Sequence, residues 1–280
     1  MLNEGFINRL LTTILTEENW RVKKKIGITS EAFIVHGQDN SLFIKLDVQT
    51  DLIKRLGELD LVPPIIQLGE FEGTSYVIED FIEGIHPDQG WIESHLTVLA
   101  KIIKTYHHDK VLQEILQTGA ILNCKKHVEF ELQQIEADLE EAKISKADVM
   151  DNYLLFAKQS EEINQFPFVP IHTNANGSNF LIANEHVYVV DWGSMILSDE
   201  LRDIGPLLWR YVAESRWSDF LKPYGLELSD MVKKRIYWWT AKQSVSNAIY
   251  FYKEKDIQRY EQCIDDFNKN LQCKENLERK

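Results

Sequence analysis

The feature that most constrains the fold is a pair of short strand-like runs, residues 180–182 and 186–190, joined by the turn Asn184-Glu185. An antiparallel hairpin of this kind brings the residues at its open end side by side. Asn179 and Asp191 flank that end, twelve residues apart. Amide and carboxylate oxygens suit a hard cation such as Mg²⁺. A carboxylate also ends many ordinary strands, and the fixed spacing from Asn179 is what favours a metal site.

The two parts of the chain differ in their periodicity. An amphipathic helix is expected over residues 5–19. Strands are expected at 20–26, 32–35, 41–46, 65–68 and 74–79, with a short helix at 50–59. Helical periodicity dominates 92–107, 126–160, 200–222 and 228–270, interrupted by strand-like runs at 168–171, 180–182 and 186–190. The pattern predicts an α+β fold with two lobes, a small β-rich N-terminal lobe (residues 1–84) and a larger helical C-terminal lobe (residues 85–280).

The net charge and the cysteines limit which classes of partner and which cellular compartment we expect. The net charge of −13 argues against nucleic acid as a partner and is compatible with a cationic small molecule in an acidic cleft. The three cysteines form no metal spacing and no even disulfide set, which favours a cytoplasmic protein with reduced thiols. No run approaches the roughly 18 apolar residues of a membrane span, and no signal peptide is evident. The sequence does not fix an oligomeric state.

Phosphoryl transfer is a chemistry that would use such a metal site. It needs a cation on the nucleotide phosphates, Mg²⁺ held by oxygen ligands, and a group that orients the attacking hydroxyl. Lys45 lies in an apolar run, where a phosphate would give its ammonium a reason to point inward; a solvent-facing lysine on an edge strand is the alternative. The turn at 27–31 offers backbone N–H groups and the hydroxyls of Thr29 and Ser30. An ordinary β-turn explains that segment equally well.

Two further positions are expected to support the site. An acidic side chain on the helix after Lys45 would orient the lysine, and Asp51 is favoured over Glu58, although Asp51 also suits a helix cap. His172 opens the loop that precedes the hairpin and follows an apolar run. We expect its imidazole to be structural, buried with satisfied hydrogen bonds.

Several motifs, in order, resemble a known family. They are Val62-Pro63-Pro64, Val77 to Gly84, Leu99 to His107, Ile171 to Ile182, Val189 to Gly193, and Leu201-Arg202-Asp203-Ile204. Together, from about residue 20 to about residue 215, they resemble the aminoglycoside phosphotransferase/choline kinase-like family, which shares the protein-kinase fold.

The resemblance implies roles for individual residues. Lys45 would bind the α- and β-phosphates of ATP, and the backbone of Asp80, Phe81 and Ile82 would meet the adenine. Asn179 and Asp191 would hold Mg²⁺, and Asp203 would brace the catalytic loop. The helices of the second lobe would wall the pocket for a small-molecule acceptor.

One position departs from the family pattern, because Asn174 stands where the family has its catalytic aspartate. No Asp or Glu lies between Glu162 and Glu185, so no neighbouring carboxylate can take its place. An amide can orient a hydroxyl but cannot accept its proton. A general base contributes about 10²–10⁴ in rate, whereas much of phosphoryl transfer depends on positioning and charge neutralisation. We therefore expect slow turnover with nucleotide binding retained.

The sequence leaves three accounts of Asn174 open: a natural protein of low activity, an enzyme that uses another orienting group, and an engineered Asp→Asn form. The leading hypothesis is an ATP- and Mg²⁺-dependent phosphotransferase acting on a hydroxyl of an aminoglycoside-like or amino-alcohol molecule. The alternative is a pseudokinase, a nucleotide-binding or scaffold protein without phosphotransfer. A protein kinase is disfavoured because the segment from Gly193 to Asp203 is short for an activation loop.

Aromatic residues crowd the last third of the chain. They are Trp209, Tyr211, Trp217, Tyr237, Trp238, Trp239, Tyr250 and Tyr252. Packing between helices is the favoured explanation, and a cation-binding aromatic pocket is the alternative.

Overall fold

The computed structural model describes residues 4–15, 20–25, 31–38, 40–144 and 152–278. The chain divides into two compact units. Unit 1 comprises residues 1–88, 109–115 and 177–195, and unit 2 comprises residues 89–108, 116–176 and 196–280. The lobe boundary expected after residue 84 falls close to the end of the first segment, but the hairpin that follows Asn179 groups with the N-terminal unit.

Unit 1 is built on a five-stranded antiparallel sheet with the strand order β1-β2-β3-β5-β4. Its strands are β1 (Arg21–Lys25), β2 (Ala32–His36), β3 (Ser41–Leu46), β4 (Ile65–Phe71) and β5 (Thr74–Asp80). The five strands predicted from the sequence are confirmed. The turn between β4 and β5 is shorter than expected, because only Glu72 and Gly73 lie outside the strands, both with positive φ angles (50° and 77°).

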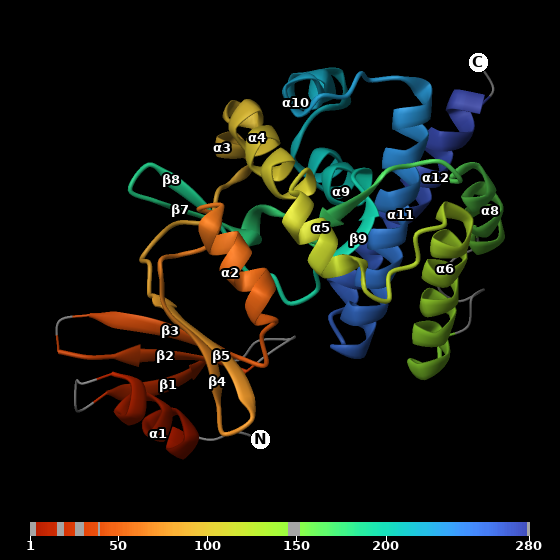
Figure 1. Ribbon diagram of the computed structural model, residues 1–280. Coiled ribbons are helices and arrows are strands. Elements are labelled where there is room, and N and C mark those ends of the chain that lie inside the picture. The colour runs from red at the N-terminus through yellow and green to blue at the C-terminus, as the bar shows by residue number, and fades with distance from the viewer. Residues whose placement is uncertain (1–3, 16–19, 26–30, 39, 145–151, 279–280) are drawn as a thin grey trace. The chain divides into compact units, whose positions relative to one another are not determined.

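Side chains alternate across this sheet. Leu42, Ile44 and Leu46 of β3 are buried in one apolar cluster with Phe6 and Leu10 of helix α1 (Glu4–Ile14). Figure 1 shows α1 lying along that face of the sheet. Because successive residues of a strand point to opposite faces, the residues between them, including Lys45, face the other side.

The predicted hairpin is present in unit 1. Strands β7 (Phe180–Ala183) and β8 (His186–Val189) pair in antiparallel register, and the turn residues Asn184 and Glu185 have φ angles of 49° and 63°. Backbone hydrogen bonds attach the hairpin to the rest of the unit, from Val189 N to Leu61 O (2.7 Å) and between Ile85 and Ile182. Leu61 follows helix α2 (Thr50–Glu58).

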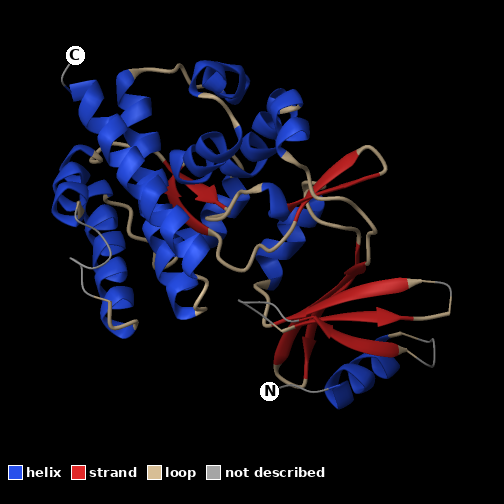
Figure 2. Ribbon diagram, turned by 180° about the vertical axis from the view of Figure 1, so that it is seen from behind, coloured by secondary structure: helices blue, strands red, loops and turns tan. Residues whose placement is uncertain are grey.

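Unit 2 is mainly helical (Figure 2). Its elements are α3 (Gln89–Ser94), α4 (Leu96–His107), α6 (Cys124–Glu141), α8 (Tyr153–Gln159), α9 (Leu201–Tyr211), α10 (Trp217–Tyr224), α11 (Asp230–Lys253) and α12 (Ile257–Glu278), with α5 (Lys110–Gln117) spanning a unit boundary. The long helical runs expected at 126–160 and 228–270 are each interrupted. The structure also contains a strand that the pattern did not indicate, β9 (Ile196–Asp199), which pairs with β6 (Phe168–Ile171).

The core of unit 2 is aromatic. Trp217, Trp238 and Trp239 are fully buried, and the ring of Trp238 stacks on Phe156 with centroids 5.1 Å apart. Packing therefore accounts for these tryptophans, whereas Tyr250 and Tyr252 are partly exposed. In the part of the chain that the structure describes, no helix has the length and apolar character needed to cross a membrane.

Candidate active site

Unit 1 contains a cavity of about 930 Å³. One wall is the sheet face that carries Lys45 and Glu79, and another is the connection from Asp80 to His86. The open end of the β7–β8 hairpin closes it with Asn179 and Asp191. The elements that the sequence singled out therefore meet around one space.

Lys45 points into this cavity. Its Nζ lies 3.3 Å from Oδ1 of Asp191, and only 13% of its side chain is exposed, against 50% for Asp191. A phosphate that entered the cavity would reach the ammonium, because Lys45 lines the cavity beside a half-exposed carboxylate.

Glu79 is a further acidic residue of the cavity, to which the sequence gave no chemical role beyond its place in the motif from Val77 to Gly84. In the β3–β5 register Glu79 lies opposite Phe43 and diagonally next to Lys45, and it is 8% exposed. Burial raises the pKa of Glu79 to about 7, while the charge of Lys45 opposes that shift. Strand alternation is the sequence signal that could have indicated this placement, because Glu79 lies two residues from Val77 and so shares its face of β5.

Asp51, the predicted partner of Lys45, lies elsewhere. It sits exposed in the first turn of α2, whose buried face carries Leu52, Ile53 and Leu56. Among the described residues the cavity-lining acids are Glu79, Asp80, Glu83 and Asp191, so Asp51 is not brought to the lysine. Glu58, the alternative, pairs with Arg55 at 2.8 Å.

The hairpin aligns the two candidate metal ligands. Val190 N donates to Asn179 O at 2.9 Å, which places Asp191 next to Asn179 at the end of the ladder. Asn179 is 7% exposed, and Asp191 has a φ angle of 69°, a strained conformation for a non-glycine residue. No cluster of three or more His, Cys, Asp or Glu side chains with metal-binding geometry occurs among the described residues. A cation here would depend on one carboxylate, one amide and ligands from outside the chain.

Two backbone N–H groups of the segment from Asp80 to Gly84 already donate hydrogen bonds within the unit. Asp80 N donates to Pro64 O and Phe81 N donates to Ser41 O, both at 3.0 Å. Ile82 N–H is therefore the amide of the predicted adenine-facing run that the sheet does not use. Gly84 is required by a close approach, because a Cβ there would lie 2.7 Å from the Ile182 carbonyl oxygen. Thr29 and Ser30 lie outside the described residues.

The loop that carries Asn174 belongs to unit 2. Asp203 is 1% exposed and accepts hydrogen bonds from His172 N (2.7 Å) and Thr173 N (2.8 Å). Tyr106 OH donates to the same carboxylate at 3.0 Å, and His107 Nε2 lies 3.2 Å from it. Burial acts to raise the pKa of Asp203, but the hydrogen bond and charge of His107 hold it below its usual range. His172 is fully buried, and Thr173 has a φ angle of 71°.

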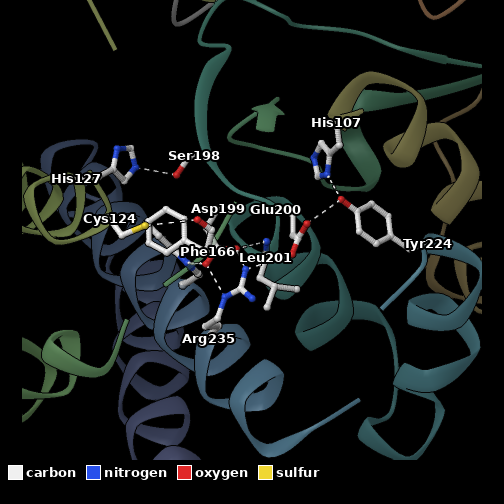
Figure 3. A network of polar contacts seen from close by, with 11 residues as sticks. His107, Cys124, His127, Phe166, Ser198, Asp199, Glu200, Leu201, Tyr224 and Arg235 are labelled. Atoms are coloured by element: carbon white, nitrogen blue, oxygen red, sulfur yellow. Dashed lines mark hydrogen bonds and ion pairs between the residues drawn. The ribbon is translucent and has the colours of Figure 1, made fainter. Parts of the chain in front are cut away.

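The hydrogen bonds continue from this loop into the core of unit 2. Figure 3 shows His107, whose Nδ1 lies 2.8 Å from the Tyr224 hydroxyl, and Tyr224 in turn reaches Glu200 (3.5 Å). Arg235 pairs with Glu200 (3.3 Å) and donates to Asp199 (2.8 Å). A connected polar network thus supports the loop, and Asn174 is exposed at its tip, where its Oδ1 accepts from Asn176 Nδ2 (2.7 Å).

Solved structures of phosphotransferases resemble this chain over almost its whole length. Spectinomycin phosphotransferase, solved with ADP and spectinomycin, superposes with a TM-score of 0.68 at 14% identity, covering 99% of both chains. A choline/ethanolamine kinase family protein from Mesorhizobium loti gives a TM-score of 0.67 at 13% identity, covering 95% of this chain and 97% of the other. The choline kinase LicA from Streptococcus pneumoniae gives 0.67 at 16% identity, covering 95% and 99%.

The chain has the fold of these phosphotransferases. The resemblance inferred from the motifs is confirmed at the level of the fold, as is the fold class of a β-rich N-terminal lobe and a helical C-terminal lobe. No family model matches the sequence. At identities below 20%, the structural similarity shows the fold alone. The acceptor and the activity have to be argued from this chain's own residues.

Proposed function

We propose that this protein binds ATP with Mg²⁺ and transfers the γ-phosphoryl group to a hydroxyl of a small molecule. The observation that carries the proposal is the meeting of Lys45, Asn179 and Asp191 at one cavity of about 930 Å³. A space of this size accommodates a nucleotide-sized ligand. The fold shared with nucleotide-binding phosphotransferases supports it.

The nucleotide has complementary groups in this cavity. The Lys45 ammonium would attract the α- and β-phosphates, and the Ile82 N–H would donate to the adenine edge. The apolar side chains Ala32, Val62 and Val77 line the same space and would cover the base. Glu79 would stand near the lysine as a second ionisable group.

Mg²⁺ fits the donor set of the hairpin. The Asn179 amide oxygen and the Asp191 carboxylate are hard oxygen ligands, and Mg²⁺ usually takes one or two such groups together with substrate phosphates and water. A bound Mg²⁺ would neutralise part of the phosphate charge. A cytoplasmic location, where ATP is abundant, is part of the same proposal, and the three free cysteines are consistent with it.

The transfer step depends on the loop at Asn174. The acceptor oxygen would form a bond to the γ-phosphorus as the bond to the β,γ-bridging oxygen breaks, releasing ADP. The hydroxyl proton would leave to solvent or to the transferred phosphoryl group, because the Asn174 amide cannot take it. Asn174 would then act by orienting the hydroxyl, and turnover would be slow.

Asn174 also motivates the second candidate, a pseudokinase that binds nucleotide without transferring phosphate. Its acceptance of a hydrogen bond from Asn176 gives the loop a stable uncharged arrangement. Both candidates require the nucleotide site, and they differ in the presence of an acceptor reaction.

The direct test is ATP-dependent phosphorylation across panels of aminoglycosides, amino alcohols, sugars and anionic sugar derivatives, with the chain as given and with Asn174→Asp. We expect Asn174→Asp to raise the rate by about 10²–10⁴, as a restored general base would, without changing ATP affinity measured by calorimetry. Asn174→Ala is the matched control and should not gain activity. ATP binding in both proteins with no phosphorylation by either would support the pseudokinase instead.

A further inference from the structure

A small recess in unit 2 adjoins the loop of Asn174. It has a volume of about 50 Å³ and is lined by residues of the loop 173–176, of α9 and of α11. From α9 come Arg202, Asp203, Pro206 and Arg210, and from α11 come Gln243 and Asn247. We call it the arginine recess. A space this small holds one functional group of a molecule whose remainder lies outside.

On each of the two helices, the residues that line the recess lie on one face. Arg202, Pro206 and Arg210 are spaced four residues apart on α9, so they share one face of that helix. Gln243 and Asn247 have the same spacing on α11. The side chains therefore converge because of regular helix geometry.

Arg202 forms the inner wall and keeps an unused donor. It is 8% exposed, pairs with Glu131 through Nη1 at 2.6 Å, and lies over the Trp239 ring at 5.3 Å. Its Nε is buried without a hydrogen-bond partner among the described residues. A buried guanidinium N–H left without an acceptor is unfavourable, so Arg202 is not fully satisfied by the side chains around it.

Arg210 is the second cation. It is exposed, lies over the Tyr211 ring at 5.7 Å, and makes no ion pair within the described parts of the chain. The nearby acid Asp266 accepts from Trp209 Nε1 at 3.2 Å. The Arg210 guanidinium therefore retains its hydrogen-bond donors at the mouth of the recess.

The acidic side chains near the recess, Glu131 and Asp203, already interact with other groups of the protein. Glu131 is shared by Arg202 and by Lys242, whose Nζ lies 2.8 Å from it. Burial and the charge of Arg202 lower the pKa of Lys242 to about 8, against the opposing charges of Glu131 and Asp138. Asp203 is held by the loop N–H groups and by Tyr106. Arg202 and Lys242 thus share the Glu131 carboxylate, and Arg202 and Arg210 are the two cations that line the recess.

Neutral groups complete the lining. Gln243 Nε2 donates to Asn247 Oδ1 at 3.0 Å, which leaves Gln243 Oε1 and Asn247 Nδ2 without a partner among the described residues. Such a donor and acceptor pair suits hydroxyl groups. The recess thus combines cationic donors with hydroxyl-binding amides, and a cationic acceptor would meet two guanidinium groups.

We propose that the arginine recess binds an anionic group, a carboxylate or a phosphate, carried by a hydroxylated acceptor molecule. The inference rests on the proposed function, because it places the acceptor beside Asn174. It assigns the acceptor a charge opposite to that of an aminoglycoside or amino alcohol.

The test uses pyranoses that differ in charge: glucuronate, glucose, glucosamine and glucose 6-phosphate. Each is titrated calorimetrically into the full chain without nucleotide. We expect glucuronate, glucose 6-phosphate or both to bind at least about tenfold more tightly than glucose and glucosamine, the scale of one charge-assisted hydrogen bond. The two anionic probes distinguish carboxylate from phosphate.

Arg210→Gln should remove about tenfold of the affinity for the anionic probe. Arg259→Gln is the matched control, since Arg259 is exposed and lies over the Phe251 ring at 5.3 Å, away from the recess. Equal effects of the two variants, tighter binding of glucosamine, or no preference for the anionic probes over glucose would each overturn the proposal. ATP is titrated separately, so that loss of nucleotide binding, which contradicts the proposed function, is distinguished from failure of the recess.

Discussion

At the scale of single residues, the nucleotide cavity differs from the sequence expectation in its acidic partner. Asp191 pairs with Lys45, and Glu79 faces the same cavity because strand alternation aims it inward, whereas the apolar face of α2 turns Asp51 outward. A carboxyl group so buried holds its proton to a higher pH than usual. Its titration should be visible in the stability of the protein.

Glu79→Gln should flatten the dependence of stability on pH. The pKa of Glu79 is raised from 4.5 to about 7 by burial, so between these values the native state holds a proton that the unfolded state has lost. Stability from this group is present at low pH and is lost as pH rises through 7, by up to about 3 kcal/mol.

Urea denaturation at pH 5 and pH 8 measures this difference. We expect Glu79→Gln to be more stable than the parent chain at pH 8 and similar to it at pH 5. Glu83→Gln removes an exposed carboxyl from the same wall of the cavity and is the control for the loss of one negative charge there. An unchanged profile in Glu79→Gln would show that its carboxyl titrates normally.

At the scale of elements, two features hold the site residues in place. One is the set of hydrogen bonds between Asp203 and the loop that carries Asn174, called here the Asp203 brace, and the other is the β7–β8 hairpin. The brace joins two backbone N–H groups to a carboxylate that is itself held by Tyr106. The sequence could indicate Asp203 through its motif, but not Tyr106 or Tyr224, because contacts across about a hundred residues leave no local pattern.

Asp203→Ala should lower the free energy of unfolding by about 3–5 kcal/mol, since it leaves buried donors and His107 without their acceptor. Chemical denaturation followed by circular dichroism gives the value. Asp219→Ala provides the comparison, because Asp219 forms an exposed pair with Arg216 and should change stability by less than about 1 kcal/mol. Similar losses in both variants would mean that the brace contributes little.

Glu185→Gly should stabilise the hairpin by about 1 kcal/mol, because glycine adopts a positive φ without the steric penalty that Glu185 bears at 63°. Thermal unfolding reports the gain. Glu185→Ala shortens the same exposed side chain without relieving the backbone, and should show no increase. A higher midpoint for the alanine variant would assign the effect to the side chain.

At the scale of the whole molecule, the sequence predicted the fold class because strand alternation and helical periodicity are local signals. It predicted the hairpin from one turn and two apolar runs. It missed β9, whose residues Ile196–Asp199 pair only with β6 and lack strand alternation of their own. The sequence did not predict the arginine recess either, because α9 and α11 come together only in the folded unit.

The charge of the chain illustrates the same limit. A net charge of −13 is compatible with a cationic partner, yet the recess beside Asn174 is lined by the guanidinium groups of Arg202 and Arg210. Bulk charge describes the surface as a whole, whereas recognition depends on the groups that lack partners at one place.

In the proposed function, Lys45, Asn179 and Asp191 form a nucleotide site that needs Mg²⁺. Its most direct test is a calorimetric titration of ATP with and without Mg²⁺, using the parent chain, Lys45→Ala and the control Lys54→Ala, an exposed lysine on α2. We predict saturable Mg²⁺-dependent binding that Lys45→Ala weakens by about tenfold or more and that Lys54→Ala leaves intact. No ATP binding by the parent chain, or equal binding by Lys45→Ala, would contradict the account.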